Sequence, residues 1–363
     1  METPVEKQSI RYLQFVLGIM IAVVGTLAAA NYLIDPYGIY RDWKPGEIYP
    51  ASDTYARIHK TERIKRVKPD AIILGSSRTD IGINPRAEFY PGLNVYNAAL
   101  SGTTIRELRL MLEFAQKVHP LKKAVLALDF IGFNTMKLEN RNFDEARVAA
   151  DALDPVNAFA NTYGTLVTLD TLRVALKHLR YIKHPERHSF PEANGHKLHN
   201  EAAWRQKKDG VHAHFMRSPN AQILGAKEFS FNYSDAPGDD TFAQYRAILN
   251  FCEAHKIDLV IYINPVHRSN LDRIREDGKW EMFEDWKRRV ATITRGTPYP
   301  LWDFATENSV TSEQLPPPGD KTTQMKYFWD TDHYKDNVGD WIQRKILGLP
   351  GDKGPNDFGM KLQ

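Results

Sequence analysis

Short apolar runs of strand length, separated by stretches with helical periodicity, constrain this chain more than any other feature. The runs cover residues 70–74, 93–97, 123–130, 258–265 and 299–304. Helical stretches cover 104–118, 240–255, 279–295 and 336–347. Continuous apolar runs joined through helices are typical of parallel strands that are buried on both faces. With right-handed crossovers, the sequence predicts an α/β fold with a doubly wound parallel sheet.

Residues 135–238 interrupt this alternation, first with helical and then with irregular, polar sequence. We expect an insertion that forms a cap or extra lobe and not an independent domain. Seven of the twelve histidines lie between His178 and His214. No His pair accompanied by a carboxylate has the HExxH arrangement of a zinc site, so an exposed His-rich segment is favoured. The alternative is a metal-binding lobe that uses the histidines at 196, 199, 212 and 214.

Residues 12–34 contain no charged side chain, and about twenty apolar residues suffice to cross a bilayer. Lys7 and Arg11 precede this segment, which favours a cytoplasmic N-terminus and an exported body. A cleaved signal peptide is the alternative, because Ala28 and Ala30 offer a small-residue cleavage site. We favour an uncleaved anchor, since apolar sequence continues to residue 34. Either way, the body is expected outside the cytoplasm.

The formal net charge of +3 is too small for a chain of 363 residues to indicate nucleic-acid binding. The single cysteine, Cys252, excludes an intrachain disulfide and is expected to be buried in a helix. Residues 56–68 are expected to form a basic amphipathic helix with a solvated charged face near the membrane, where it can contact anionic headgroups.

Polar residues follow the predicted strands directly, at the edge where an open parallel sheet binds ligands. They are Ser76, Ser77 and Arg78 after the first run, Gly102 after the second, Asp129 and Asn134 after the third, and Asn264 and His267 after the fourth. Asp330 and His333 precede the last helix.

A hydroxyl nucleophile needs a base within hydrogen-bond reach and a carboxylate that orients the base. Ser77, His333 and Asp330 can take these roles, because the spacing of Asp330 and His333 lets one turn present both side chains to the same point. An oxyanion hole could use the backbone N–H groups of Ser77 and Gly102 and the side-chain amide of Asn134. Taken alone, Ser77 is better explained as an ordinary turn residue after a strand, and only the order and spacing of all these residues favour a nucleophile.

Four stretches in this order resemble the blocks of the SGNH (GDSL-type) hydrolase superfamily: "ILGSSRTD", "YNAALSGTT", "LDFIGFN" and "DTDH". The resemblance covers about residues 70–134 and 240–347. It implies a flavodoxin-like three-layer α/β/α fold and no metal or organic cofactor. It also implies the following roles: Ser77 as nucleophile, Gly102 and Asn134 at the oxyanion, and Asp330 with His333 in the last block.

Three positions depart from the family pattern or have no role in it. Ser76 stands where many members have Asp, and Asp332 is a second candidate partner for His333, although only Asp330 has the family spacing. Arg78 has no assigned role; it either pairs with a carboxylate or faces an anionic substrate.

The motif "GSSR" after an N-terminal anchor is similar to a membrane-tethered, exported branch that includes accessory acyltransferases of polysaccharide O-acetylation and of teichoic-acid D-alanylation. This similarity implies an esterase or O-acyltransferase, with acetyl as the expected acyl group, that acts on a cell-surface polysaccharide. A multispanning membrane O-acyltransferase is the implied partner. The alternative is an inactive SGNH-like scaffold or binding protein of a polysaccharide export complex.

The chain is therefore expected to divide into five parts. These are a cytoplasmic N-terminus (1–11), a transmembrane anchor (12–34), a stalk with a basic helix (35–69), an SGNH-like catalytic domain (70–347) that contains the insertion 135–238, and a C-terminal tail (348–363).

Overall fold

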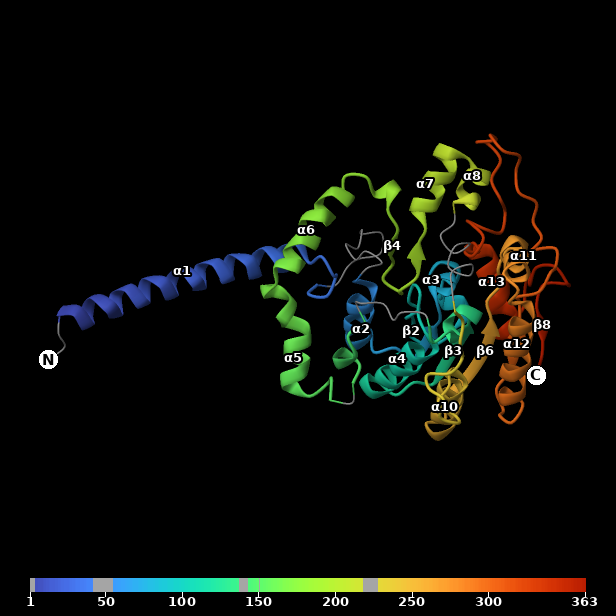
Figure 1. Cartoon of the computed structure of the whole chain (residues 1–363), viewed down its shortest axis with the longest axis horizontal. Coiled ribbons are helices and arrows are strands. Elements are labelled where there is room, and N and C mark those ends of the chain that lie inside the picture. Colours follow the sequence, from blue (N-terminus) through green and yellow to red (C-terminus); the bar gives the residue numbers. More distant parts are fainter. Residues whose placement is uncertain (1–3, 42–54, 137–142, 150, 218–227) are drawn as a thin grey trace.

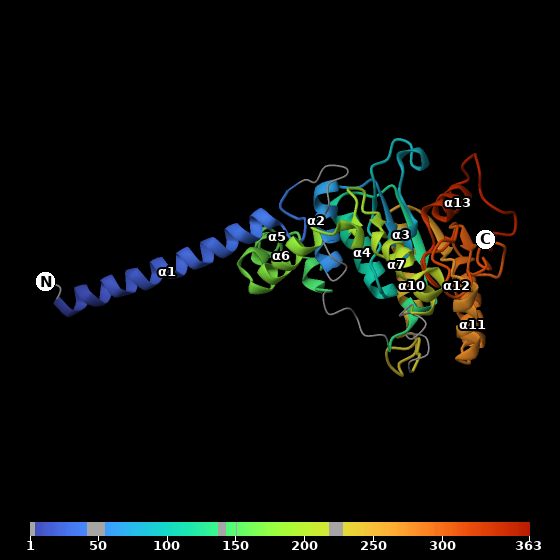
Figure 2. The ribbon, with the colours of Figure 1, turned by 90° about the horizontal axis from the view of Figure 1, so that it is seen from above.

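The computed structural model describes residues 4–41, 55–136, 143–149, 151–217 and 228–363. A long helix, α1 (Pro4–Ile34), projects from one side of a mixed α/β body, and the C-terminus lies on the opposite side (Figure 1). The same projection is visible from above (Figure 2). Within α1, residues Gln8–Ile34 are long and apolar enough to cross a membrane.

A six-stranded sheet with the order β2-β1-β3-β6-β7-β8 forms the centre of the body. All neighbouring strands pair in parallel except β7 and β8, so the predicted parallel sheet is confirmed. The strands are β1 (Ala71–Leu74), β2 (Val95–Asn97), β3 (Lys123–Leu128), β6 (Asp258–Ile263), β7 (Leu301–Asp303) and β8 (Met360–Lys361). The last of these lies in the segment expected to be only a tail.

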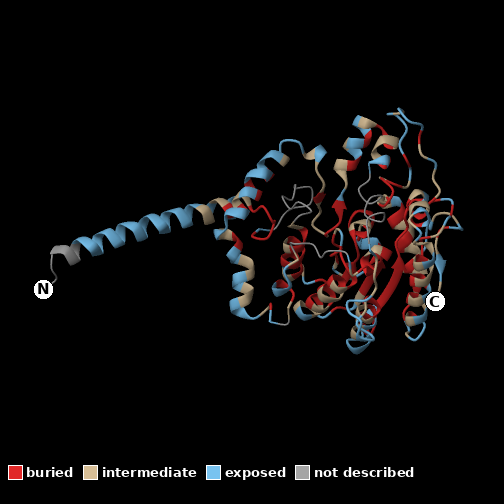
Figure 3. Ribbon diagram, viewed as in Figure 1, coloured by how far each residue is buried: buried red, intermediate tan, exposed pale blue. Residues whose placement is uncertain are grey.

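Helices cover both faces of the sheet. Along β1, Ile72 and Leu74 join one apolar cluster and Ile73 joins the other, because successive side chains of a strand point to opposite faces. The helices of the first face are α4 (Ile105–Val118), α10 (Thr241–Ala254), α11 (Arg268–Glu276) and α12 (Trp280–Thr294), and those of the second are α13 (Asp336–Ile346) and α8 (Val211–Met216). The buried residues concentrate at this sheet (Figure 3).

Helix α2 (Ala56–Val67) corrects the expectation of a solvated charged face. Arg57, Lys60 and Glu62 are each at most 3% exposed. The Arg57 guanidinium binds the Glu107 carboxylate at 3.0 Å, and Lys60 Nζ binds the carboxylate of Asp80 and three backbone carbonyls. These partners lie far along the chain, so the charge pattern of the helix alone resembles that of a surface helix. Part of the predicted stalk, residues 42–54, lies outside the described residues.

The described part of the insertion contains short helices and one small hairpin. In chain order these are η4 (Glu145–Arg147), α5 (Pro155–Tyr163), η5 (Gly164–Val167), α6 (Leu169–Tyr181), η6 (Pro185–Arg187), β4 (Phe190–Pro191), β5 (Lys197–Leu198), α7 (Asn200–Asp209) and α8. We call α5, η5 and α6 together the arm. The arm contacts the end of α1, whereas the hairpin and α7 lie nearer the edge of the sheet (Figure 1).

Candidate active site

The turn after β1 places Ser77 at the first position of the short helix α3 (Ser77–Gly82). Ser76 is the N-cap of this helix, and its Oγ accepts a hydrogen bond from the Arg78 N–H at 3.3 Å. Gly75 is required before it, because a Cβ at that position would lie 2.3 Å from Oγ1 of Thr79. The two serines therefore differ in role: Ser76 caps the helix, which leaves the Ser77 hydroxyl available for the site.

Ser77, His333 and Asp330 form a continuous chain of hydrogen-bonding groups. Nε2 of His333 lies 2.8 Å from Oγ of Ser77, and Nδ1 lies 2.8 Å from Oδ2 of Asp330. The backbone N–H of His333 also donates to Oδ1 of Asp330 at 2.9 Å, which fixes the turn that presents both side chains. The structure thus brings together the three residues that the sequence singled out.

The charges around His333 favour its protonated form. Burial lowers the pKa of His333, but the carboxylate of Asp330 and, more weakly, that of Asp332 outweigh burial and raise it above the usual 6.5. Burial raises the pKa of Asp330, and the neighbouring His333 outweighs this and holds it well below its usual value. Asp330 is therefore a permanent carboxylate that stabilises a cationic imidazole, as a base that accepts a proton requires.

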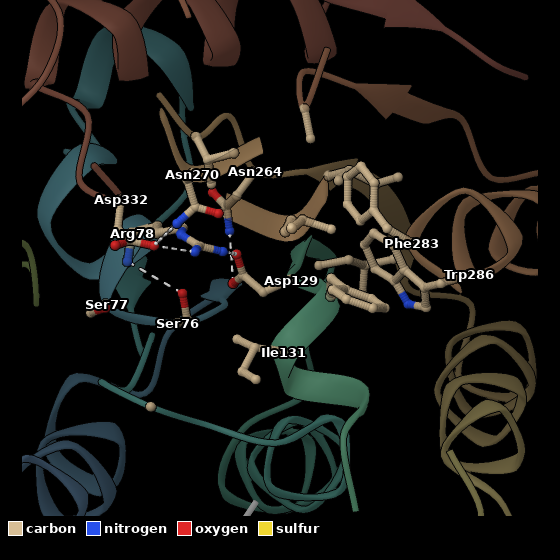
Figure 4. Close-up of a pocket in the computed structure, with 17 residues that line it drawn as sticks. Ser76, Ser77, Arg78, Asp129, Ile131, Asn264, Asn270, Phe283, Trp286 and Asp332 are labelled. Atoms are coloured by element: carbon tan, nitrogen blue, oxygen red, sulfur yellow. Dashed lines mark hydrogen bonds and ion pairs between the residues drawn. The ribbon is translucent and has the colours of Figure 1, made fainter. Parts of the chain in front are cut away.

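Arg78 lies beside the nucleophile turn and forms ion pairs with both Asp129 and Asp332 (Figure 4). Asp129 directly follows β3, and Asp332 directly precedes His333. The guanidinium is buried, but its two carboxylate partners still raise its pKa above the usual value. Of the two roles open to Arg78, the structure shows the pairing with carboxylates.

Two amides complete this polar cluster. Nδ2 of Asn264 donates to Asp129 at 3.1 Å, and Nδ2 of Asn270 donates to Asp332 at 2.9 Å. Asn264 directly follows β6 and was among the residues predicted at the sheet edge. Asn270 lies on α11, and no feature of the sequence pointed to it. Asp332 therefore belongs to the Arg78 cluster, and of these two aspartates it is Asp330 that lies within hydrogen-bond distance of the His333 ring.

A pocket of about 110 Å³ opens beside Ser77. Ser76, Ser77, Arg78 and Gly102 line its polar end, and Phe283 and Trp286 of α12 line its apolar end (Figure 4). Gly102 has a φ of +63°, a backbone conformation that glycine adopts without strain. The predicted nucleophile and one predicted oxyanion residue thus share a cavity that continues into an apolar space.

Asn134 is a correction to the predicted oxyanion set. Its Oδ1 accepts hydrogen bonds from the N–H groups of Met136 and Ser230, both at 3.1 Å, and its Nδ2 donates to the carbonyl of Glu228. A 3₁₀ turn, η3 (Phe130–Phe133), separates it from the end of β3. The amide therefore fixes the segment at 228–230 and is not among the described residues that line the pocket.

Among the described residues, the histidines of the insertion do not gather into the four-histidine metal site that was the alternative to an exposed His-rich segment. His196 is buried, with Nδ1 2.7 Å from Glu192 and Nε2 2.8 Å from the carbonyl of Ile81. His199 instead lies beside the ring of His333, with ring centroids 5.4 Å apart. His199, Asp330 and His333 place their ligand atoms within 4.8 Å of one another, so these three residues could together hold a metal ion.

Comparison with known protein families gives no matching family model, and no curated protein matches the chain. The chemistry of the site therefore has to be argued from its own geometry. That geometry provides a hydroxyl, a base, a carboxylate that orients the base and a partly apolar pocket.

Proposed function

We propose that this chain is a membrane-anchored, exported serine esterase or O-acyltransferase of the SGNH type, with a cell-surface polysaccharide as acyl donor or acceptor. The observation that carries the proposal is the relay from Ser77 through His333 to Asp330, with contacts of 2.8 Å at both ends of the imidazole. Supporting it, the strand order β2-β1-β3-β6-β7 with helices on both faces suits a flavodoxin-like three-layer α/β/α fold.

The reaction proceeds through an acyl-serine. His333 Nε2 takes the Ser77 hydroxyl proton as Oγ attacks the acyl carbonyl, and the imidazolium then donates that proton to the departing alkoxide. The N–H groups of Ser77 and Gly102 stabilise the oxyanion. Water or a sugar hydroxyl, deprotonated by the same imidazole, then attacks the acyl carbonyl. The bond between the acyl carbon and Ser77 Oγ breaks, the imidazolium returns the proton to Oγ, and the free acid or the acylated sugar leaves. Acetyl is the acyl group that the sequence resemblance implies, and the apolar part of the pocket has room for its methyl and for a longer chain.

Intact-mass analysis of the purified full chain after brief incubation with p-nitrophenyl acetate tests this function. We expect one acetyl group on Ser77 and release of p-nitrophenol, both abolished in Ser77→Ala. Ser76→Ala is the matched control: it removes the helix cap, worth about 1 kcal/mol, and keeps the nucleophile, so it should still be acylated. No adduct and no turnover in the wild-type chain would contradict the enzymatic function and leave the inactive scaffold as the alternative.

A soluble oligosaccharide added to the same assay separates the two reactions. A transferase moves acetyl groups onto the sugar and releases p-nitrophenol faster as the sugar concentration rises. An esterase releases acetate at a rate that the sugar does not increase.

A further inference from the structure

The arm exposes an unusual number of large apolar side chains. Exposed fractions are 79% for Val156 and 66% for Phe159 on α5, and 66%, 55% and 45% for Leu169, Leu176 and Leu179 on α6. Apolar side chains gathered in this way on an exported protein indicate a surface that is covered in its working state.

Helix α6 is apolar on two sides, which a surface helix facing only water would not be. The inward side of α6 carries its buried residues, which are Thr171, Val174, Ala175 and His178. The spacing from Leu169 to Leu176 and Leu179 places these three leucines together on the outward side. Exposed basic residues flank these leucines: Arg173, Lys177 and Arg180 on α6, and Lys183 just after it.

The arm is joined to the end of the candidate membrane helix. Asn31, in the last turn of α1, is fully buried, and its Nδ2 donates to the carbonyls of Leu166 at 2.7 Å and Thr168 at 3.3 Å. Those two carbonyls belong to the segment between α5 and α6. In Figure 1 the arm runs across the direction of α1, between that helix and the rest of the body.

The length of α1 determines at which level of the bilayer the junction between α1 and the arm lies. About twenty helical residues cross the hydrocarbon core of a bilayer, so a crossing that begins after Arg11 ends close to Asn31. Tyr32 follows at once and is 51% exposed, as expected for an aromatic residue at headgroup level. The arm, bound to Asn31, then lies at the same level, with its apolar side chains at the boundary between headgroups and acyl chains.

We propose that the outward face of the arm binds the surface of the bilayer that α1 crosses, with its leucines and Phe159 between the lipids and its basic residues against anionic phosphate headgroups. An exposed apolar stripe beside Lys and Arg is the pattern of an interfacial helix. The arm is then a second membrane contact that holds the body in a defined orientation on its anchor. This inference requires α1 to cross the bilayer but is independent of catalysis at Ser77.

Spin labels on the full chain in lipid nanodiscs test this contact. Single cysteines are introduced as Phe159→Cys and Leu176→Cys, and the nitroxides are compared for relaxation by oxygen, which partitions into lipid, and by a water-soluble nickel chelate. Cys252 can stay in place, because it is fully buried and burial raises the pKa of its thiol to about 12. Ile21→Cys in α1 supplies the lipid reference, and Met360→Cys, an exposed position on the far side of the body, supplies the water reference.

We expect the nitroxides at 159 and 176 to be relaxed more by oxygen than by the nickel chelate, as the nitroxide at 21 is. This difference should be larger in nanodiscs that contain phosphatidylglycerol than in nanodiscs of phosphatidylcholine alone. The triple variant R173Q/K177Q/R180Q should lose that lipid preference. Labels as accessible to nickel as the one at 360 would overturn the proposal. Labels shielded from both reagents would overturn it as well, since a protein partner or a second copy would then cover the arm. All labelled positions are exposed, and circular dichroism verifies that each variant is folded.

Discussion

Oγ of Ser77 and Nε2 of His333 lie 2.8 Å apart although 256 positions separate the two residues in the chain. The parallel sheet creates this proximity: β1 ends at the nucleophile turn, and the loop before α13 reaches the same edge. Asp330 contacts the other nitrogen of the imidazole, so a substitution at any one of these three residues should impair the chemistry of the other two.

The pH dependence of ester turnover should reflect His333. The imidazole accepts a proton only when neutral, and Asp330 and Asp332 raise its pKa, so activity should fall as the pH drops through a midpoint above 6.5. Asp330→Asn removes the carboxylate that raises the pKa most, so the midpoint should move to lower pH while the rate falls about 10⁴-fold. The pH profile of kcat/KM is the measurement. Asp258→Asn, at the amino end of β6 and away from the site, should leave this pH profile unchanged. A wild-type midpoint below 6.5 would contradict the assignment of the titrating group to His333.

Arg78 should matter to stability through the two carboxylates that it joins. Arg78→Met leaves Asp129 and Asp332 buried without their cation, which should lower the free energy of unfolding by about 3–5 kcal/mol. Arg78→Lys should cost less, because it keeps the charge and loses the planar fork that reaches both carboxylates. Denaturant unfolding measures both variants. Arg86→Met is the control, because the Arg86 side chain is 42% exposed in its pair with Asp340 and should contribute at most about 1 kcal/mol.

The pocket should set the preferred acyl length. A cavity of 150 Å³ holds benzene, so the pocket of about 110 Å³ has room for roughly four carbons. Burial of each methylene is worth about 0.8 kcal/mol, so kcat/KM should rise about fourfold per carbon from acetyl to butyryl p-nitrophenyl esters.

Ile131→Trp is designed to fill that space. Ile131 lines the pocket and is only partly buried, so the larger ring should narrow the cavity without unfolding the chain. The preference for butyryl should disappear and acetyl turnover should remain. Leu110→Trp, outside this pocket, is the control. A length profile that Ile131→Trp does not alter would show that the acyl chain lies elsewhere.

Lys60 should be among the most sensitive positions of α2. Its ammonium group is buried against Asp80 and against the carbonyls of Asn97 and Ala99. Lys60→Met leaves a buried carboxylate uncompensated and should destabilise the fold by about 3–5 kcal/mol, as thermal or denaturant unfolding would show. Lys122→Met, at a side chain that is 65% exposed, should have no measurable effect. Equal effects of the two substitutions would show that Lys60 is solvated after all.

The sheet was predictable because each parallel strand is a continuous apolar run. Lys123–Leu128 and Asp258–Ile263 lie inside the predicted runs. The two-residue strand β8 was not predictable, because it is too short to leave a pattern and depends on pairing with Trp302 and Asp303. The parallel strands are therefore encoded locally, whereas the short antiparallel strand β8 depends on tertiary contact.

In the site, too, some contacts could be predicted from local sequence and others could not. Asp330 and His333 are three residues apart, so one turn determines their contact, and Ser77 follows from the rule that ligand groups gather at the carboxyl ends of strands. Asn134, predicted as an oxyanion donor, is not among the described residues that line the pocket, and beyond η3 its amide contacts the segment at 228–230. Arg78 could not be paired in advance, because its partners Asp129 and Asp332 lie 51 and 254 positions away.

The antiparallel strand β8 affects whether copies of this protein can pair through their sheet edges. Copies of a protein tethered to a membrane share a thin layer, where their effective concentration is high and exposed sheet edges tend to pair between molecules. Met360–Lys361 covers the edge of β7 and, at two residues, offers little backbone for a neighbouring copy to extend. Residues Met360–Lys361 thus occupy the hydrogen-bonding edge of β7, and their removal would expose that backbone to neighbouring copies.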